Sequence, residues 1–168
     1  MTKLEQFPDH AARLKFEMES VGGILIDRYL DRPELDGLFQ ACDVYVSLHR
    51  SEGFGLTLAE AMYMGKPVIA TDYGGNTDFT TVANSYPVAY RLVELEADYG
   101  PYPKGQVWAE ADVDHAAALM RYVYAHPEEE RAKGQRAQAD MEAWYGHAAT
   151  AQKMVARLER VMRKDRKP

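Results

Sequence analysis

The fold is decided by one stretch of the sequence, Ser51-Glu52-Gly53-Phe54-Gly55-Leu56-Thr57-Leu58-Ala59-Glu60-Ala61-Met62. The run before it, Val44 to Leu48, is apolar, too short and too continuous for a surface helix, and indicates a buried strand. The residues after the two glycines follow a helical pattern that ends at Gly65, which suits a left-handed helix cap. A strand, a glycine turn and a helix in this order are typical of open α/β sheets, in which ligands bind at the carboxyl ends of the strands.

The residue types in this stretch suit a ligand that carries phosphate. Glycines on either side of Phe54 let the backbone come close to a ligand and leave amides free at a helix start. Such amides, together with the positive end of the helix dipole, attract phosphate. Glu52 in the turn and Glu60 about one turn into the helix repel phosphate, but carboxylates accept hydrogen bonds well and sugar hydroxyls supply paired donors.

From the residues alone, two interpretations stay open. In one, the helix start holds a diphosphate and one acid faces each sugar of a nucleotide-sugar. In the other, the turn is only a helix N-terminus that carries glutamate because the helix dipole favours negative charge there.

Outside this stretch, short β-branched runs alternate with helical patterns. The alternation predicts an α/β fold with a Rossmann-like parallel sheet of three to four strands and C-terminal helices. Because doubly wound sheets usually have about five or six strands, we expect a truncated sheet that lacks its first strands. The predicted strands cover residues 24–26, 44–48, 66–71 and 86–93, and the predicted helices cover residues 9–20, 33–42, 56–64, 112–125, 127–146 and 148–163.

Composition limits the class of protein. A chain of 168 residues suits a single domain, here residues 1–168 with a core over 20–125 and closing helices over 126–164. The net charge of −6 argues against a nucleic-acid partner, and a lone cysteine, Cys42, excludes an internal disulfide and a thiolate zinc cluster. The sequence has no stretch of about 18 apolar residues, so we expect a cytoplasmic protein whose membrane contact is at most peripheral.

The chain resembles the C-terminal, donor-binding domain of family 4 type retaining glycosyltransferases, which have the GT-B fold. Glu52 and Glu60, separated by seven residues, match the E-x7-E signature of that family. The resemblance extends over about residues 20–150. The matching runs, in order and spacing, are Ala41–Ser47, Ser51–Leu56, Glu60–Met62, Gly65–Thr71 and Gly74–Asn76.

The resemblance implies a role for each position of the signature. Glu52 would contact the donor sugar near its reacting carbon and is the expected catalytic residue, and Glu60 would bind the ribose hydroxyls. Amides of the glycine turn, over Gly53, Phe54, Gly55 and Leu56, would reach the sugar and the diphosphate. Thr57 would donate a hydroxyl to phosphate or simply face its own helix.

The flanking positions have two interpretations each. His49 and Asn76 are expected to bind the donor, but His49 also suits a structural histidine at a strand end. Asn76, with Asp78 and Phe79, would line the donor pocket or cap the next short helix. Tyr29 is a candidate for the nucleotide base or a half-buried core tyrosine. Trp108 and Trp144 are expected to anchor the core rather than to stack on sugars.

Two departures from the family limit the predicted activity. The family holds the donor diphosphate with an arginine and a lysine after the first strand of this domain, and Arg13 and Lys15 do not match them. The acceptor-binding N-terminal domain also has no counterpart here. We therefore expect the donor-binding half of a hexosyltransferase for a glycan or lipid-linked acceptor, inactive alone, using a UDP- or GDP-hexose with no cofactor and no metal.

The expected partners follow from the same departures: an acceptor-binding N-terminal domain or subunit, and self-association through an exposed sheet edge. Two other functions stay open. One is a non-catalytic module that binds nucleotide-sugars. The other is a protein-interaction module in which the crevice has lost its ligand.

Overall fold

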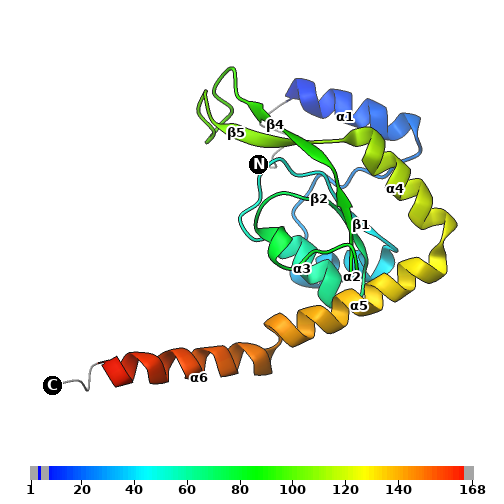
Figure 1. Cartoon of the computed structure of the whole chain (residues 1–168). Helices are drawn as coiled ribbons and strands as arrows, with labels where there is room; N and C mark the ends of the chain where they lie inside the picture. The colour runs from blue at the N-terminus through cyan, green and yellow to red at the C-terminus, as the bar shows by residue number, and fades with distance from the viewer. Residues whose placement is uncertain (1–3, 5–7, 165–168) are drawn as a thin grey trace. The chain divides into compact units, whose positions relative to one another are not determined.

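The computed structural model describes residue 4 and residues 8–164 of the chain, and shows the α/β fold that the sequence predicts (Figure 1). The chain divides into two compact units, residues 1–38 and 39–168. Each unit is described by itself.

The first unit contains the predicted helix α1 (Pro8–Ser20) and most of α2 (Arg32–Ala41). Asp31 and Glu34 cap the start of α2 reciprocally, because the amide of Glu34 donates to Asp31 Oδ1 over 2.9 Å and the amide of Asp31 donates to Glu34 Oε2 over 3.1 Å. The predicted strand over residues 24–26 is wrong. This run is irregular and partly exposed in the described chain, because an apolar run becomes a strand only where a neighbouring strand pairs with it.

The second unit is built on a three-stranded parallel sheet in the order β1-β2-β3, with β1 at Tyr45–Ser47, β2 at Val68–Thr71 and β3 at Tyr86–Val88. The central strand β2 is buried along its whole length. Ile69 packs with α4 (Val113–Ala125), so Val68 and Ala70 point to the opposite face. Helix α3 (Leu56–Tyr63) connects β1 to β2 and contacts α5 (Pro127–Tyr145).

Helix α3 ends as predicted at Gly65. This glycine has φ +75°, and the amide of Lys66 donates to the carbonyl of Ala61 over 2.9 Å. The backbone of α5 comes so close that a Cβ at Gly134 would overlap the carbonyl oxygen of Gly65. The beginning of β2 and the end of α3 are therefore fixed by α5.

The predicted strand over residues 86–93 is corrected to two strands in different sheets. β3 ends at Val88, and β4 (Tyr90–Glu94) pairs antiparallel with β5 (Val107–Ala111), a strand that the sequence analysis missed. Ala89 separates them because its amide donates to His115 Nδ1 and its carbonyl accepts from the amide of Asp112. Both partners belong to the start of α4, so the chain leaves the parallel sheet there.

The three C-terminal helices agree with the prediction. Asp112 caps α4 by accepting from the amide of His115, and Pro127 occupies the first turn of α5. The last helix, α6 (His147–Lys164), follows Gly146 and extends away from the sheet (Figure 1).

Candidate functional site

Two glycine turns meet at the carboxyl ends of β1 and β2, where α/β sheets bind ligands. The amide of Gly75 donates to the carbonyl of Glu52 over 3.0 Å. A Cβ at Gly75 would overlap the carbonyl oxygen of Gly53, and a Cβ at Gly74 would lie 2.6 Å from the carbonyl oxygen of Glu52. Because Gly74 also has φ +104°, only glycines allow these backbones to touch. We call this contact the turn crossing.

The start of α3 is held against the turn crossing by Gly55. This residue is buried with φ +93°, and a Cβ there would press on Leu58, Asn76 and Phe79. The hydrogen-bond ladder of α3 begins with the amide of Ala59 donating to the carbonyl of Gly55 over 2.8 Å. The amides of residues 56–58 precede that ladder and form the positive end of the helix.

The carboxylate of Glu52 bends back over its own turn. Its Oε1 accepts from the amide of Gly55 over 2.9 Å and from the amide of Phe54 over 3.4 Å. Two of the amides expected to reach a donor therefore bind Glu52 in this structure. The same bonds orient the half-buried carboxylate at the turn, a feature that the sequence does not reveal.

The side chains of His49 and Asn76 support the turn crossing by hydrogen bonds. His49 Nε2 lies 2.8 Å from the carbonyl oxygen of Tyr73 and 3.1 Å from Asn76 Oδ1, so we assign the ring proton to Nε2. Nδ1 then accepts from Ser47, 3.1 Å away. The fully buried Asn76 amide also donates to the carbonyl of Thr71 over 3.1 Å. Their polar atoms join the two turns, and Asn76 exposes no atom to a ligand.

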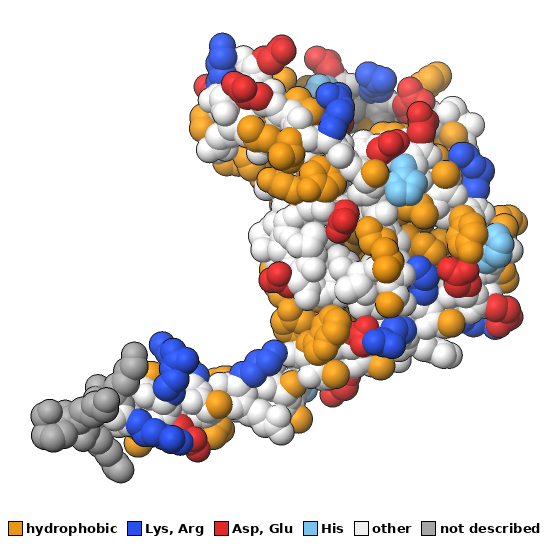
Figure 2. All heavy atoms as spheres, in the orientation of Figure 1, with side chains coloured by type: hydrophobic (Ala, Val, Ile, Leu, Met, Phe, Trp, Pro, Cys, Tyr) orange, Lys and Arg blue, Asp and Glu red, His pale blue; other side chains and the backbone are white. Residues whose placement is uncertain are grey.

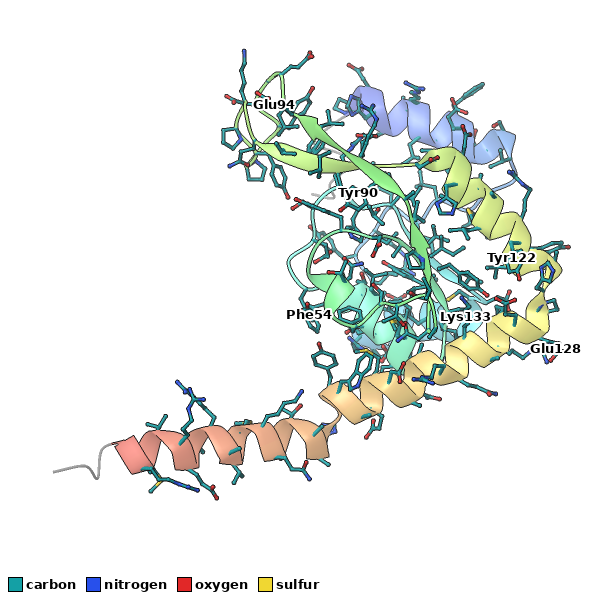
Figure 3. All side chains as sticks on the ribbon, in the orientation of Figure 1. Phe54, Tyr90, Glu94, Tyr122, Glu128 and Lys133 are labelled. Atoms are coloured by element: carbon teal, nitrogen blue, oxygen red, sulfur yellow. The ribbon has the colours of Figure 1, made fainter. Side chains whose placement is uncertain are left out.

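The remaining predicted site residues surround the start of α3. The Phe54 ring, 37% exposed, packs 5.2 Å from that of Phe79 and 5.6 Å from that of Tyr145 (Figure 3). The Thr57 hydroxyl accepts from Tyr45 over 2.9 Å and keeps its own proton to donate. Glu60 is half-buried and is the fifth residue of the eight-residue helix α3.

Three weaker candidates fall outside this group. Phe79 is fully buried and supports the turn from behind, so it does not line a pocket. Asp78 is exposed at the end of the 3₁₀ turn Gly75–Asp78. Tyr29 belongs to the first unit and is exposed, so its proposed contact with a base stays a prediction.

The connection between the site and the β4–β5 hairpin was not predicted from the sequence. Arg50 Nε and Nη2 donate to the two carboxylate oxygens of Glu110 over 2.8 and 2.9 Å. This pairing lowers the pKa of the Glu110 carboxyl and raises the pKa of the Arg50 guanidinium. The carbonyl of Arg50 also accepts from the amide of Ala109 over 3.0 Å. The alternation of small and large residues in Val107–Ala111 was the available sign of a strand.

Two further properties concern residue 4 and residues 8–164. There, no three His, Cys, Asp or Glu side chains gather in a way that could hold a metal ion. In the same part of the chain, none of the helices has both the length and the apolar character needed to cross a bilayer.

Comparisons with known proteins place this site in context. A family model described as glycosyl transferases group 1 matches residues 13–140. The chain is 30% identical to D-inositol 3-phosphate glycosyltransferase of Mycolicibacterium paratuberculosis over 93% of this chain and 31% of the relative. It is 42% identical to the lipopolysaccharide core biosynthesis mannosyltransferase LpsB of Rhizobium meliloti over 34% of this chain and 17% of the relative. The chain thus spans less than a third of these curated relatives.

Solved structures show the same fold. HepE of Anabaena in complex with UDP-glucose superposes with a TM-score of 0.64 and 19% identity, over 91% of this chain and 37% of HepE. The C-terminal domain of the group 1 glycosyl transferase LpcC of Francisella tularensis superposes with a TM-score of 0.64 and 20% identity, over 86% of this chain and 74% of that domain.

Proposed function

The chain belongs to the group 1 glycosyl transferases, and from this membership we propose that its turn crossing binds the nucleotide-sugar donor of a retaining hexosyl transfer. The observation that carries the proposal is the position of the signature. Glu52 and the first turn of α3 lie at the carboxyl ends of two parallel strands, held by backbone contacts that only glycine permits, and Glu60 follows further along α3. The HepE structures, solved with UDP and UDP-glucose, support a nucleotide-sugar as the ligand class.

The proposed transfer requires this half of the site to stabilise negative charge on the leaving diphosphate. As the bond between the sugar carbon and the diphosphate oxygen breaks, the electron pair moves to the diphosphate and its negative charge grows. The amides of residues 56–58 and the positive end of α3 would stabilise that charge, with the Thr57 hydroxyl as a further donor. The oxygen of the acceptor hydroxyl would form the new bond on the same face of the sugar, and its proton would pass to the departing diphosphate, which has gained the electron pair of the broken bond.

Glu52 and Glu60 would orient the two sugars of the donor. Because the turn amides hold Oε1 of Glu52, we assign its Oε2 to a hydroxyl of the hexose near the reacting carbon. Glu60, further along α3, would accept from the ribose hydroxyls. His49 and Asn76 then act as positioning residues, because their polar atoms join the two turns.

The acceptor and the turnover belong to a larger assembly. Because the chain spans less than a third of these curated relatives, we propose that an acceptor-binding part, on the same or another polypeptide, completes the cleft. The residues described here would then bind a UDP- or GDP-hexose without turnover by themselves. The acceptor is proposed to be a glycan or a lipid-linked sugar. The second candidate is a non-catalytic nucleotide-sugar-binding module, which the capped amides of Phe54 and Gly55 favour.

Calorimetric titration with UDP, GDP, UDP-glucose and GDP-mannose tests the proposal. We expect one nucleotide series to bind with a Kd on the order of 1 μM to 1 mM. Glu60→Gln should weaken that series about tenfold, since it removes a charge-assisted hydrogen bond from the ribose. Glu128→Gln, an exposed carboxylate at the start of α5, is the matched control and should bind normally (Figure 3). EDTA should leave the affinity unchanged, because α3 supplies the positive potential.

Two outcomes would contradict the proposal. If no nucleotide binds, the turn crossing is not a donor site. If Glu60→Gln and Glu128→Gln have the same effect, a nucleotide binds elsewhere. Glycosyl transfer to added sugars by the chain alone would refute the proposed dependence on an acceptor-binding part.

A further inference from the structure

The segment that joins β4 to β5, residues 95–106, lies on the surface and is held by hydrogen bonds of its own backbone. The amide of Leu95 donates to the carbonyl of Gln106 over 2.8 Å, and the amide of Gly105 donates to the carbonyl of Leu95 over 2.9 Å. In the middle, Tyr99 and Tyr102 exchange two backbone hydrogen bonds of 2.8 and 3.1 Å across a tight turn. The side chain of Leu95 is buried beneath. The conformation of the segment is therefore supported by bonds within the chain itself.

An aromatic cluster is formed by Tyr99 and Tyr102 of this segment together with Trp108 of β5. The Tyr99 ring centroid lies 5.3 Å from that of Trp108, and the Tyr102 centroid lies 6.1 Å from it. Trp108 is half-buried among the hairpin rings and does not belong to the buried core in which the sequence analysis expected it, and Tyr99 is 51% exposed. Figure 2 shows hydrophobic side chains gathered on the projection formed by β4 and β5, at the upper left.

A guanidinium and a carboxylate border the aromatic cluster. The Arg50 Cζ atom lies 4.9 Å from the Trp108 ring centroid, and Arg50 pairs with Glu110. Since the pair uses Nε and Nη2 of Arg50, Nη1 points away from the carboxylate and can donate elsewhere. Each carboxylate oxygen of Glu110 keeps a second lone pair. The side chains of Arg50 and Glu110 are 52% and 32% exposed, so a ligand can reach them.

The aromatic cluster is joined to the turn crossing by a short path. Arg50 comes two residues before Glu52 in the chain, and its carbonyl accepts from the amide of Ala109 in β5. On the other turn, the Tyr73 ring lies 5.2 Å from that of Tyr90 at the start of β4 (Figure 3). Both turns of the proposed donor site therefore contact the hairpin directly.

This combination of groups fits a carbohydrate better than a phosphate or a nucleic acid. A pyranose ring has a face of C–H bonds that packs on the electron-rich face of an aromatic ring, and a rim of hydroxyls that both donate and accept. Exposed tyrosine supplies the ring, Arg50 supplies donors and Glu110 supplies acceptors. An anion would instead need an unpaired positive charge beside the rings, whereas Arg50 is paired with Glu110 and Arg91 also lies opposite Glu110 across the two strands.

We propose that Tyr99, with Trp108, Arg50 and Glu110, forms a carbohydrate subsite on the β4–β5 hairpin that holds a sugar unit of the acceptor. Its role toward the acceptor rests on the proposed function, but sugar binding at the hairpin does not depend on it. The subsite gives this chain a part in acceptor selection, in addition to the part that binds the donor.

The test uses the whole chain and four trisaccharides: maltotriose, cellotriose, mannotriose and chitotriose. Binding is measured by saturation-transfer NMR and by tryptophan fluorescence, to which Trp108 and Trp144 are the two contributors. We expect at least one trisaccharide to bind with a Kd on the order of 1 mM. Tyr99→Ala should weaken it about fivefold or more. Tyr124→Ala on α4, where the ring is 91% exposed, is the matched control and should bind normally.

Glu110→Gln is a second variant that probes the same subsite without removing a ring. Its result therefore still applies if Tyr99→Ala disturbs the fold of residues 95–106. Glu110→Gln keeps the shape of the side chain, removes its charge, and should weaken the same trisaccharide about threefold. The inference is overturned if none of the four trisaccharides binds, or if Tyr99→Ala and Tyr124→Ala bind equally well. It is also overturned if Tyr99→Ala weakens UDP or GDP instead, because the rings would then hold the base.

The same titrations separate this inference from the proposed function. Nucleotide binding without trisaccharide binding would rule out the hairpin subsite and support the donor site. If a trisaccharide binds, Tyr99→Ala abolishes that binding and no nucleotide binds, the subsite is supported and the donor site is ruled out.

Discussion

The turn crossing and the β4–β5 hairpin lie at the same edge of the sheet but are held by different forces. In the turn crossing, backbone meets backbone and a buried amide, Asn76, fills the space beneath. The hairpin is attached by a solvent-accessible ion pair, Arg50–Glu110, by one backbone hydrogen bond from Ala109 to Arg50, and by the contact between the Tyr73 and Tyr90 rings. Because of this difference, we expect substitutions in the turn crossing to change both the stability of the fold and the affinity for the donor. Changes in the hairpin should leave the fold nearly intact.

The largest effect is expected from Gly75→Ala. Its methyl group would overlap the carbonyl oxygen of Gly53, so one of the two turns must move. We expect a loss of about 3 kcal/mol in the free energy of unfolding and loss of nucleotide binding, measured by urea denaturation and calorimetry.

Gly53→Ala is the matched control for stability, because a Cβ at Gly53 meets no atom within 4 Å. It should change the free energy of unfolding by less than about 0.5 kcal/mol. Equal stability of the two variants would show that the turns do not touch as described.

An intermediate effect is expected from Asn76→Ala. The change removes the side-chain donor to the buried carbonyl of Thr71 and one of the two acceptors of the His49 Nε2 proton, at a cost of about 2 kcal/mol. Nucleotide affinity should fall as well, although Asn76 touches no solvent, because the second turn loses its support.

Asn84→Ala separates the two effects of that change. Asn84 is also fully buried, and it donates to the backbone carbonyl of Phe79 and to Asp140 rather than to either of the two turns. Its replacement should destabilise the protein to a similar extent but leave nucleotide affinity unchanged. If both variants weaken nucleotide binding equally, global stability and not the second turn sets the affinity.

The smallest effect is expected from the Arg50–Glu110 pair. A double-mutant cycle with Arg50→Ala and Glu110→Ala should give a coupling of about 0.5 kcal/mol, because solvent screens a partly exposed pair. The pKa of Glu110 is lowered from 4.5 in the folded state. The coupling should therefore be complete above pH 4.5 and disappear as the pH falls through that lowered pKa. A coupling that survives at acid pH would show that the two residues interact through packing.

Local patterns explain why part of this site was predictable. The glycines around Phe54 and the seven-residue spacing of Glu52 and Glu60 act within a few residues of one another, and they place the strand, turn and helix correctly. The three-stranded parallel sheet and the C-terminal helices follow from similar short-range patterns.

The errors arise where a distant segment decides the structure. Ala89 ends β3 because it binds Asp112 and His115, more than twenty residues away. The run over 24–26 has strand-forming residues but no paired strand in the described chain. The fold of Glu52 over the amides of Phe54 and Gly55 depends on rotamer choice, which no spacing reveals.

The most direct test of the central claim is an amide chemical-shift map of the chain during titration with UDP-glucose and GDP-mannose. We predict that the largest shifts fall on the amides of residues 53–58 and on Gly75, with one of the two donors. Shifts in Glu52→Gln should be redistributed between Phe54 and Gly55, since the carboxylate that caps them has lost its charge. Shifts confined to other parts of the chain, with residues 53–58 unchanged, would contradict the assignment of the turn crossing as the donor site.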